Sequence, residues 1–570
     1  MRHRWPEDTQ FTQVVLEVED NICAVCGAAL HICDHRRHRI FTLQGPVEVV
    51  CKLAHCSDRQ CAAHATTRSP YAETTLTLPW WLIGWDVFCW MGHRRFARHW
   101  SVPQIRSELV DTYQISLSAD AIEDAIRRYQ TMLAARQQDP QVVAAAYRHV
   151  AALVLSIDGL QPEKGHETLY VVRELNAKRI WFAEALLSSS TDEVRRLLSQ
   201  ARAWATQLGL PVHLWLSDKQ DACVTGIAAE FPGVPHRYCV NHFLRDLAKP
   251  MLEADSHAKV KMRRKGRGLR AIEREVLQQR RRSAGETPAV APAPTTPATP
   301  LPAHQVAEAV PVATDPPAKA GEVVLDYCSA VRGILNEDQG GPFQPPGLRM
   351  AEALGDVRAS LQRNLDANHG GRAHTQLQRL AACIDRGVAD VQAEHQVVRQ
   401  HLHEIEQVAA TLSHANGPAT ERQAQFTRLQ EEFAGLATPF SQHLAGVMAS
   451  FAAGLFVGGD TLPCLQDNLE LERWFRKPKG HERHIHGHRH AGVRIVQEGP
   501  TLLLALDAHG THPEPFTAHD LEPYQDTSAP PCQVEALHRR KIMRKARAKK
   551  RTIRLKARIV LSLQVVIMLW

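Results

Sequence analysis

Two short apolar segments that each end in an aspartate constrain the fold of this chain more than any other feature. The first is Leu153–Gly159, which reads LVLSIDG, and the second is Val212–Asp218, which reads VHLWLSD. Runs of β-branched and apolar residues of this length predict buried strands. If the two strands are neighbours in one sheet, Asp158 and Asp218 lie close together. Carboxylates brought together at strand ends can bind a divalent cation.

The segments around these strands alternate between strand and helix patterns. After Asp158 we expect strands over 167–175 and 179–187, a helix over 191–208, the strand that ends in Asp218, a helix over 222–231 and a strand over 235–239. The order βββαβαβ is that of an RNase H-like core, in which the first and fourth strands are neighbours. The predicted fold class is therefore α/β, with a mixed sheet that brings Asp158 beside Asp218.

Two cysteine pairs near the N-terminus predict a metal-bound ribbon. Cys23 and Cys26 form a Cys-x-x-Cys pair, and Cys56 and Cys61 follow about thirty residues later, with short strands expected over 39–43 and 47–52 between them. Two such pairs suit a tetrahedral Zn²⁺ site, and cysteines bunched in this way favour metal binding over disulfides. Four nearby residues are alternative ligands: Cys33, Cys51, His55 and His64.

Residues 75–140 have the pattern of a helical DNA-binding domain. A buried helix is expected over 78–98, and capped helices are expected to begin after Ser101 and Ser118. A short helix, a tight connection and a second helix are typical of a helix-turn-helix, whose second helix enters the major groove. In the preceding ribbon, Arg36 and Arg37 are candidates for contact with DNA.

The charge distribution also favours a nucleic-acid partner. The net charge of +7 is modest for 570 residues, but Lys and Arg cluster over 259–282 and 538–558. The first 13 residues are too polar for a signal peptide, and the apolar segment 559–570 is too short to cross a bilayer. We therefore expect a cytoplasmic protein that does not insert into a membrane.

Four ordered motifs resemble the DDE transposases of bacterial insertion sequences, particularly those with an N-terminal zinc ribbon. The motifs are Ser156–Gly159, Leu216–Asp218, the Cys-x-x-His element Cys239–His242, and Asn468–Phe475 followed by His481–His484. The resemblance implies a nucleoid-associated enzyme that acts on double-stranded DNA, both transposon ends and target. It also implies a homodimer or higher oligomer, because two DNA ends must be joined.

The resemblance implies that three carboxylates hold Mg²⁺ or Mn²⁺ for strand cleavage and strand transfer. Asp158 and Asp218 supply two of them, and either Glu470 or Glu472 supplies the third. Alignment of the aromatic pair after these residues with the family pattern favours Glu472. Cys239 and His242 are expected beside the metal site in a positioning role, although they could equally pack against the sheet as ordinary helix residues.

The basic segment that follows the third acid is expected to bind DNA. Its candidate residues are Arg476, Lys477, Lys479 and Arg483. The segment between Asp218 and the third acid is far longer than one helix and a loop, so we expect an insertion in the catalytic domain. Such an insertion could clamp transposon ends or form a dimer contact, or it could be a structural spacer.

The predicted organisation has eight parts. They are a zinc ribbon (1–70), the helix-turn-helix-like domain (75–140), the first part of the catalytic core (148–250), a basic helix (251–284), a disordered linker rich in Pro and Ala (285–321), a helical insertion (322–458), the third-carboxylate helix with its basic segment (459–495), and a basic C-terminal tail (496–570).

Two other functions fit the same sequence. The first is a DNA-binding protein that retains the fold of a decayed transposase, which the Pro-rich interruption and Pro478 in the basic segment would explain. The second is a nuclease that hydrolyses DNA at the same site without joining strands.

Overall fold

The computed structural model describes most of the chain. The described residues are Trp5, 7–161, 167–265, 268–283, 316–337, 340–367, 370–462, 469–487, 492–512, 514–542 and 545. The chain divides into two compact units: the first comprises Met1–Cys239 and Thr461–Trp570, and the second is the intervening Val240–Asp460. Apolar cores are present in both units.

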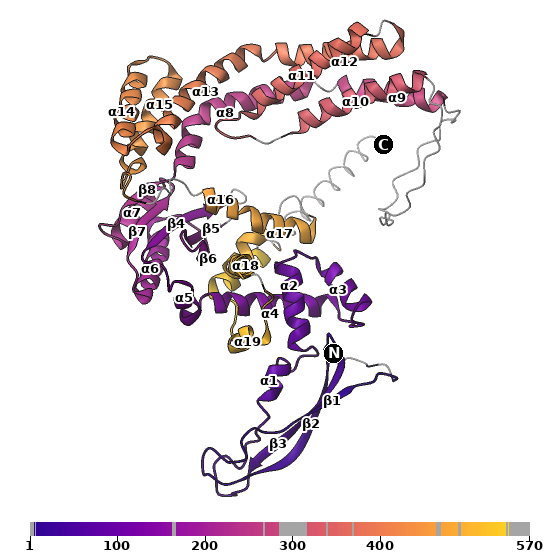
Figure 1. Ribbon diagram of the computed structural model, residues 1–570, viewed down its shortest axis with the longest axis vertical. Coiled ribbons are helices and arrows are strands. Elements are labelled where there is room, and N and C mark those ends of the chain that lie inside the picture. Colours follow the sequence, from indigo (N-terminus) through magenta and orange to yellow (C-terminus); the bar gives the residue numbers. More distant parts are fainter. Residues whose placement is uncertain are drawn as a thin grey trace, which may run out of the picture. The chain divides into compact units, whose positions relative to one another are not determined.

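A five-stranded mixed sheet lies in the first unit (Figure 1). Its strands in spatial order are β6 (Arg179–Leu186), β5 (Thr168–Glu174), β4 (Leu153–Leu160), β7 (Val212–Ser217) and β8 (His236–Tyr238). β4, β5 and β6 form an antiparallel meander, whereas β7 is parallel to β4 and β8 is parallel to β7. The prediction of an α/β fold is confirmed, and the first and fourth predicted strands are neighbours.

Helices cover both faces of this sheet. Those on one face are α6 (Thr191–Leu208) and α7 (Asp221–Glu230), and those on the other side are α18 (Gly492–Thr511) and α4 (Ala119–Gln137). α18 packs on β6, and α4 packs on α18. The Asp507 carboxylate of α18 accepts a hydrogen bond from the Ile180 N–H of β6 at 2.9 Å, which attaches the C-terminal part of the chain to the sheet.

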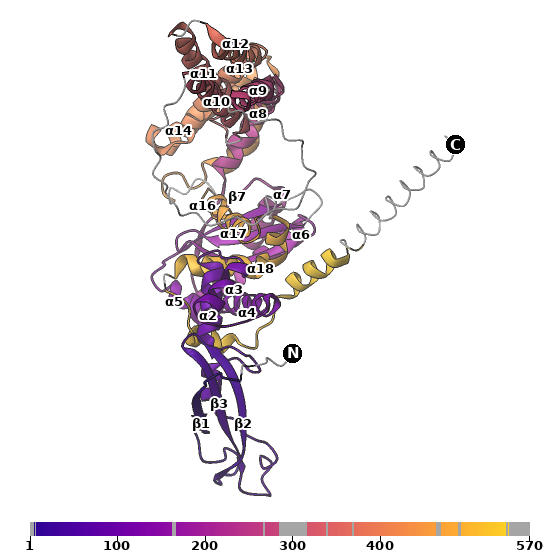
Figure 2. The same cartoon turned by 90° about the vertical axis from the view of Figure 1, so that its right-hand side faces the viewer.

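A second sheet is built from three N-terminal strands, seen side by side in Figure 2. They are β1 (Thr12–Leu16), β2 (Leu30–Thr42) and β3 (Gly45–Cys56), in the order β1-β3-β2. β2 and β3 form a long antiparallel hairpin, and β1 adds to β3 in parallel. The hairpin strands are longer than predicted, because Thr42 pairs with Gly45 across a two-residue loop and the ladder continues to Leu30.

The chain between the two sheets is helical. Its helices are α1 (Ala72–Leu76), α2 (Trp85–Phe96), α3 (Val102–Asp111), α4 and α5 (Pro140–Ala146). The helix predicted over 78–98 begins seven residues later than expected, because Pro79 and the positive φ of Trp80 (66°) turn the chain before Gly84 provides the N-cap. Ser101 and Ser118 cap α3 and α4 as predicted.

The C-terminal part of the first unit is helical in its described residues. It contains α16 (Leu469–Trp474), α17 (Arg476–His486), α18, α19 (Ala518–Leu521) and a 3₁₀ turn at Glu522–Tyr524. Pro478 lies in the first turn of α17, where a missing N–H costs no helical hydrogen bond. Pro478 is therefore compatible with a regular helix.

The described part of the second unit is a helical assembly (Figure 1). Its helices are α8 (Val240–Lys265), α9 (Leu269–Ser283), α10 (Pro316–Asn336), α11 (Pro346–Ala367), α12 (Gly371–Ala389), α13 (Gln392–Leu412), α14 (Ala419–Gly435) and α15 (Pro439–Leu455), with a 3₁₀ turn at His414–Asn416. Asp255 is fully buried and accepts the N–H groups of Gly347 and Leu348 at 2.6 and 2.7 Å, which caps α11.

Several predicted segments differ from these helices. The predicted basic helix over 251–284 falls on two helices, α8 and α9. Most of the predicted linker, residues 285–315, lies outside the described residues, and α10 begins at Pro316. Most of the predicted basic segment 538–558 and the apolar segment 559–570 also lie outside them. Among the described helices, none has the length and apolar composition needed to span a bilayer.

Candidate metal-binding active site

Asp158 lies near the end of β4 on the α18 side of the sheet. Leu155 and Ile157 belong to the core shared with α6 and α7, so strand alternation places Asp158 on the opposite face. Leu160, the next residue on that face, belongs to the core that contains α18. Asp158 is only 8% exposed, and its Oδ1 accepts a hydrogen bond from the Gly159 N–H at 2.7 Å. The strand thus fixes a nearly buried carboxylate on this face.

Asp218 directly follows β7 and lies level with Asp158. Ser156 pairs with Leu216 in the parallel ladder, so the two aspartates occupy the next equivalent positions on adjacent strands, whose axes are about 4.8 Å apart. Leu216 shares an apolar cluster with Val154 of β4. Asp218 lies two residues after Leu216, and Asp158 lies four residues after Val154. Side chains at even spacing along a strand point to the same face, so both carboxylates belong to one face of the sheet.

Hydrogen bonds fix the backbone around Asp218. Its Oδ1 accepts the Gln220 N–H at 3.3 Å, and the Tyr170 hydroxyl donates to the Gln220 side chain at 2.8 Å. On the other side, Ser217 Oγ lies 2.8 Å from His236 Nε2. Burial lowers the pKa of His236 to about 4, so its ring is neutral at pH 7 and adds no charge beside the carboxylates.

Glu472 comes from α16 and reaches the same site. Leu471 and Trp474 pack into the core that also contains Leu160 of β4, which anchors α16 on the face that carries Asp158. A carboxylate oxygen of Glu472 lies within 4.8 Å of one from Asp158. The structure therefore brings together two acids that are more than three hundred residues apart in sequence.

The alternative third acid cannot be compared in the same way. Glu470 belongs to α16, but its side chain lies outside the described residues, and so does the whole of Asn468. Glu472 stays the preferred third carboxylate because one of its oxygens lies within 4.8 Å of an oxygen of Asp158.

Lys479 brings a positive charge within electrostatic range of the two acids. It lies on α17 and is half-buried, and burial lowers its pKa, as does the charge of Arg483, whereas Glu472 and Asp158 act in the opposite direction. Arg476, Lys477 and Arg483 are exposed on the same helix. A carboxylate pair with a lysine beside it can accept a phosphate group once cations neutralise the acids.

A buried contact between α17 and α2 determines which face of α17 is exposed. His481 is 1% exposed, its Nδ1 lies 2.9 Å from His99 Nδ1, and its ring stacks on Phe96 at 5.7 Å. Burial lowers the pKa of His481 to about 2, so this contact uses a neutral ring. The segment predicted to bind DNA is therefore a helix, and His481 lies on its buried side.

An acidic side chain is buried in the same interface. Glu482 is 2% exposed, and the Arg494 Nε lies 3.8 Å from its carboxylate. Burial raises the pKa of Glu482 to about 7, and the charges of Arg494 and Arg95 oppose that rise. Nothing in the sequence pattern identified this residue, because its burial depends on how α17 packs against other helices.

Cys239 and His242 flank the junction between the two units. Cys239 is fully buried, and its N–H donates to the Ser217 carbonyl at 2.8 Å, so it extends the pairing of β8 with β7. His242 lies in the first turn of α8. Their predicted positioning role stays a prediction.

Four cysteines form a compact cluster at the far end of the N-terminal hairpin. The sulfurs of Cys23, Cys26, Cys56 and Cys61 all lie within 4.8 Å of one another. The Val25 and Cys26 N–H groups lower the pKa of the Cys23 thiol to about 6, which favours the thiolate that metals bind. This cluster can bind a metal ion such as zinc. Its four cysteines are the ligands that the sequence analysis preferred.

The two arginines predicted to contact DNA have different surroundings. Arg37 is exposed on β2. Arg36 is half-buried and forms an ion pair with Glu73 of α1. Arg36 therefore has a partner within the protein, and contact of either residue with DNA stays a prediction.

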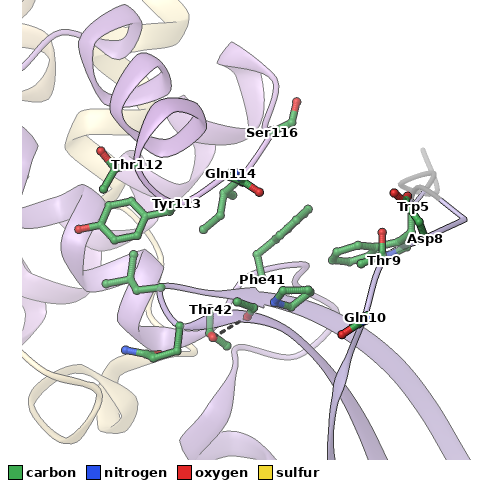
Figure 3. Close-up of a pocket in the computed structure, with 15 residues that line it drawn as sticks. Trp5, Asp8, Thr9, Gln10, Phe41, Thr42, Thr112, Tyr113, Gln114 and Ser116 are labelled. Atoms are coloured by element: carbon green, nitrogen blue, oxygen red, sulfur yellow. Dashed lines mark hydrogen bonds between the residues drawn. The ribbon is translucent and has the colours of Figure 1, made fainter.

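A cavity lies away from these acids, between the hairpin and the end of α3. It has a volume of about 790 Å³. Figure 3 shows Trp5, Thr9 and Gln10 on one wall and Tyr113 and Gln114 on the other. Its lining contains no lysine, arginine or histidine, so it is not suited to hold a phosphate.

The geometry therefore identifies the end of β4 as the candidate active site. A comparison with models of known protein families found no match, and a comparison with curated protein sequences found no significant similarity.

Proposed function

We propose that the chain is a DDE transposase that binds the terminal inverted repeats of an insertion sequence and catalyses DNA strand cleavage and strand transfer. The observation that carries this proposal is the approach of Glu472 to Asp158 within 4.8 Å, on the face where Asp218 lies level with Asp158. The strand order β6-β5-β4-β7-β8, with β4 and β7 parallel, is the one expected for an RNase H-like core.

The chemistry of the donor set supports Mg²⁺ or Mn²⁺ at this site. Asp158, Asp218 and Glu472 offer only carboxylate oxygens, which are the protein ligands that these hard cations prefer. When bound, a pair of such ions supplies the charge that activates an attacking water or 3′-hydroxyl and stabilises the leaving oxygen. The part of the chain is to hold the three carboxylates on a rigid sheet and an anchored helix.

Basic residues of α17 are suited to hold the DNA strand at this site. Lys479 is within electrostatic range of Asp158 and Glu472, so its positive charge would favour a phosphate bound at the site. The exposed Arg476, Lys477 and Arg483 would bind neighbouring phosphates and make binding depend on salt concentration. In this proposal the N-terminal hairpin and its four-cysteine cluster contribute to recognition of the transposon ends.

The test is a strand-cleavage and strand-transfer assay with the purified full-length chain. The substrate is duplex DNA carrying the inverted repeats that flank its gene, with Mg²⁺ present and absent. Asp158→Asn should abolish cleavage and joining, because it removes the buried ligand, yet leave end binding in a mobility-shift assay unchanged.

The matched control is Asp221→Asn, which removes an exposed carboxylate in the first turn of α7. It should retain full activity. Loss of end binding together with cleavage in Asp158→Asn would contradict the proposal. Specific end binding without any cleavage by the unaltered chain would instead indicate a decayed transposase, and cleavage without joining would indicate a nuclease.

A further inference from the structure

A second cluster of metal-binding side chains lies on the N-terminal sheet, apart from the four-cysteine cluster. It consists of His38 on β2, Cys51 on β3 and Glu73 on α1, and one ligand atom from each lies within 4.8 Å of the others. Cys51 is fully buried, and the other two are partly exposed. The cluster is thus closed on the sheet side and accessible at its edge.

Strand register explains why these side chains meet. Cys51 pairs with Arg36, and His38 is two residues further along β2, so all three side chains point to the same face of the sheet. Glu73 of α1 reaches this face, where it pairs with Arg36. His38 Nδ1 lies 3.6 Å from the nearer carboxylate oxygen of Glu73.

The spacing fits a small tetrahedral ion. Zinc ligands at about 2.0–2.1 Å from the metal are about 3.4 Å apart in a tetrahedron. The nitrogen-to-oxygen distance of 3.6 Å is close to that value, so His38 and Glu73 need little movement to share an ion. A thiolate, an imidazole and a carboxylate form a donor set suited to Zn²⁺, with one position left for water.

Arg36 orients the carboxylate without occupying the oxygen that faces His38. It pairs with Oε2 of Glu73, whereas His38 faces Oε1. Carboxylate ligands of metal ions commonly have a second hydrogen-bond partner of this kind. The interaction assigns Arg36 a role inside the protein.

The cluster is separate from the four-cysteine cluster. Cys51 and Cys56 are five residues apart on β3, so their side chains point to opposite faces and their backbones are about 16 Å apart. One ion cannot contact both.

We propose that His38, Cys51 and Glu73 bind a second zinc ion that fastens α1 to the N-terminal sheet. α1 has only five residues and none of them is buried, so it lacks a core of its own. The ion would tie this helix to the hairpin and thereby stabilise the connection between the hairpin and α2.

Zinc stoichiometry of the tag-free, full-length protein tests this proposal. The protein, carrying Asp158→Asn in every sample so that the proposed carboxylate site is impaired, is incubated with excess ZnCl₂, desalted and analysed by mass spectrometry for zinc per chain. The chain without further substitution should hold two zinc ions, and Cys51→Ala and Glu73→Gln should each hold one. The ion that remains at the four-cysteine cluster shows that the hairpin is still folded.

The matched control is Cys33→Ala, which removes an exposed thiol from the same hairpin and should leave two ions. If the chain without further substitution holds one zinc ion, the proposal is wrong. It is also wrong if Cys51→Ala and Glu73→Gln both retain two, because the second ion then lies elsewhere. If Cys51→Ala loses both ions through unfolding, the milder Glu73→Gln decides between these outcomes.

Discussion

The third carboxylate of the proposed site depends on how one turn of helix is anchored. Leu471 and Trp474 are buried in the core of the first unit, and Glu472 between them reaches Asp158. The position of the Glu472 carboxylate is therefore a consequence of the packing of α16.

Substitution of each glutamate separates the two candidates. Glu472→Gln should reduce Mg²⁺-dependent cleavage of transposon ends by at least about 10³-fold, since an amide is a poor ligand for a hard cation. Glu470→Gln is the matched variant and should retain near-normal rates. Single-turnover cleavage at saturating DNA measures both, and the reverse order of effects would assign the third ligand to Glu470.

At the residue scale, the sequence predicted those features that depend on the spacing of residues close together in the chain. The apolar alternation before Asp158 and Asp218 predicted buried strands, and the Cys-x-x-Cys spacing predicted the preferred metal cluster. Sequence reasoning failed for Glu482, His481 and Glu73. Their surroundings come from strands and helices far away in the sequence, so no local spacing indicates burial or a partner.

At the scale of the element, α17 has two chemically different faces. Pro478, His481, Glu482 and Ile485 are buried, whereas Arg476, Lys477 and Arg483 are exposed. Buried residues at a spacing of three and four are typical of an amphipathic helix. The packing of α17 is sensitive to pH because its buried face contains a histidine and a glutamate. Charging either side chain in this buried environment costs free energy.

The carboxylate of Glu482 predicts a measurable pH dependence of stability. Its pKa is raised from an ordinary 4.5 to about 7 by burial. Between these values the folded protein retains a proton that the unfolded chain has lost, so stability falls as pH rises from about 4.5 to 7. Glu482→Gln removes this loss. The free energy of unfolding of the variant minus that of the unaltered chain should therefore be greater at pH 8 than at pH 5, by up to roughly 3 kcal/mol.

Urea unfolding followed by tryptophan fluorescence measures this difference at the two pH values. The matched control is Glu514→Gln, which removes an exposed carboxylate of the same unit. It should not reproduce the change in pH dependence expected for Glu482→Gln. An equal stability difference between Glu482→Gln and the unaltered chain at both pH values would show that Glu482 has an ordinary pKa.

Element boundaries illustrate where sequence patterns lose resolution. The helix predicted over 191–208 coincides with α6, because its apolar positions and its terminal Gly209 are local signals. Within the helical insertion predicted over 322–458, the chain breaks between α12 and α13 and again between α14 and α15. The second break falls before Pro439, which hydropathy alone does not detect.

The exposed residues of α4 bear on the predicted helix-turn-helix. Ten residues of α4 are buried against its neighbours, including Tyr129, Met132 and Leu133 in its second half. Exposed positions in its first turns include Asp120, Glu123 and Asp124, whose charge opposes contact with phosphates. Entry of α4 into the major groove stays a prediction, and the basic residues of α17 are better suited to hold DNA.

At the scale of the whole molecule, the chain combines two compact units with separate cores. The first unit contains every tryptophan of the chain, because all 11 lie outside Val240–Asp460. Tryptophan fluorescence therefore reports unfolding of the first unit, whereas far-UV circular dichroism reports both. This distribution makes their stabilities separately measurable.

Matched core truncations should act on one unit each. Leu153 of β4 and Leu380 of α12 are both fully buried, and each belongs to the core of its own unit. Either leucine-to-alanine change should cost about 2–5 kcal/mol. Leu153→Ala should lower the urea midpoint seen by fluorescence, and Leu380→Ala should leave it unchanged while lowering a transition seen by circular dichroism. Equal shifts in the fluorescence midpoint would mean that the two units unfold as one.

The position of the second unit within the chain has a consequence for synthesis on the ribosome. Asp158 and Asp218 are made before the helical unit and Glu472 after it, so the ribosome must translate about 250 further residues before the third acid exists. At 5–20 residues per second this takes on the order of 10–50 s. Throughout that interval the nascent chain carries its N-terminal hairpin and two of the three acids, so the proposed metal site can be completed only late in synthesis.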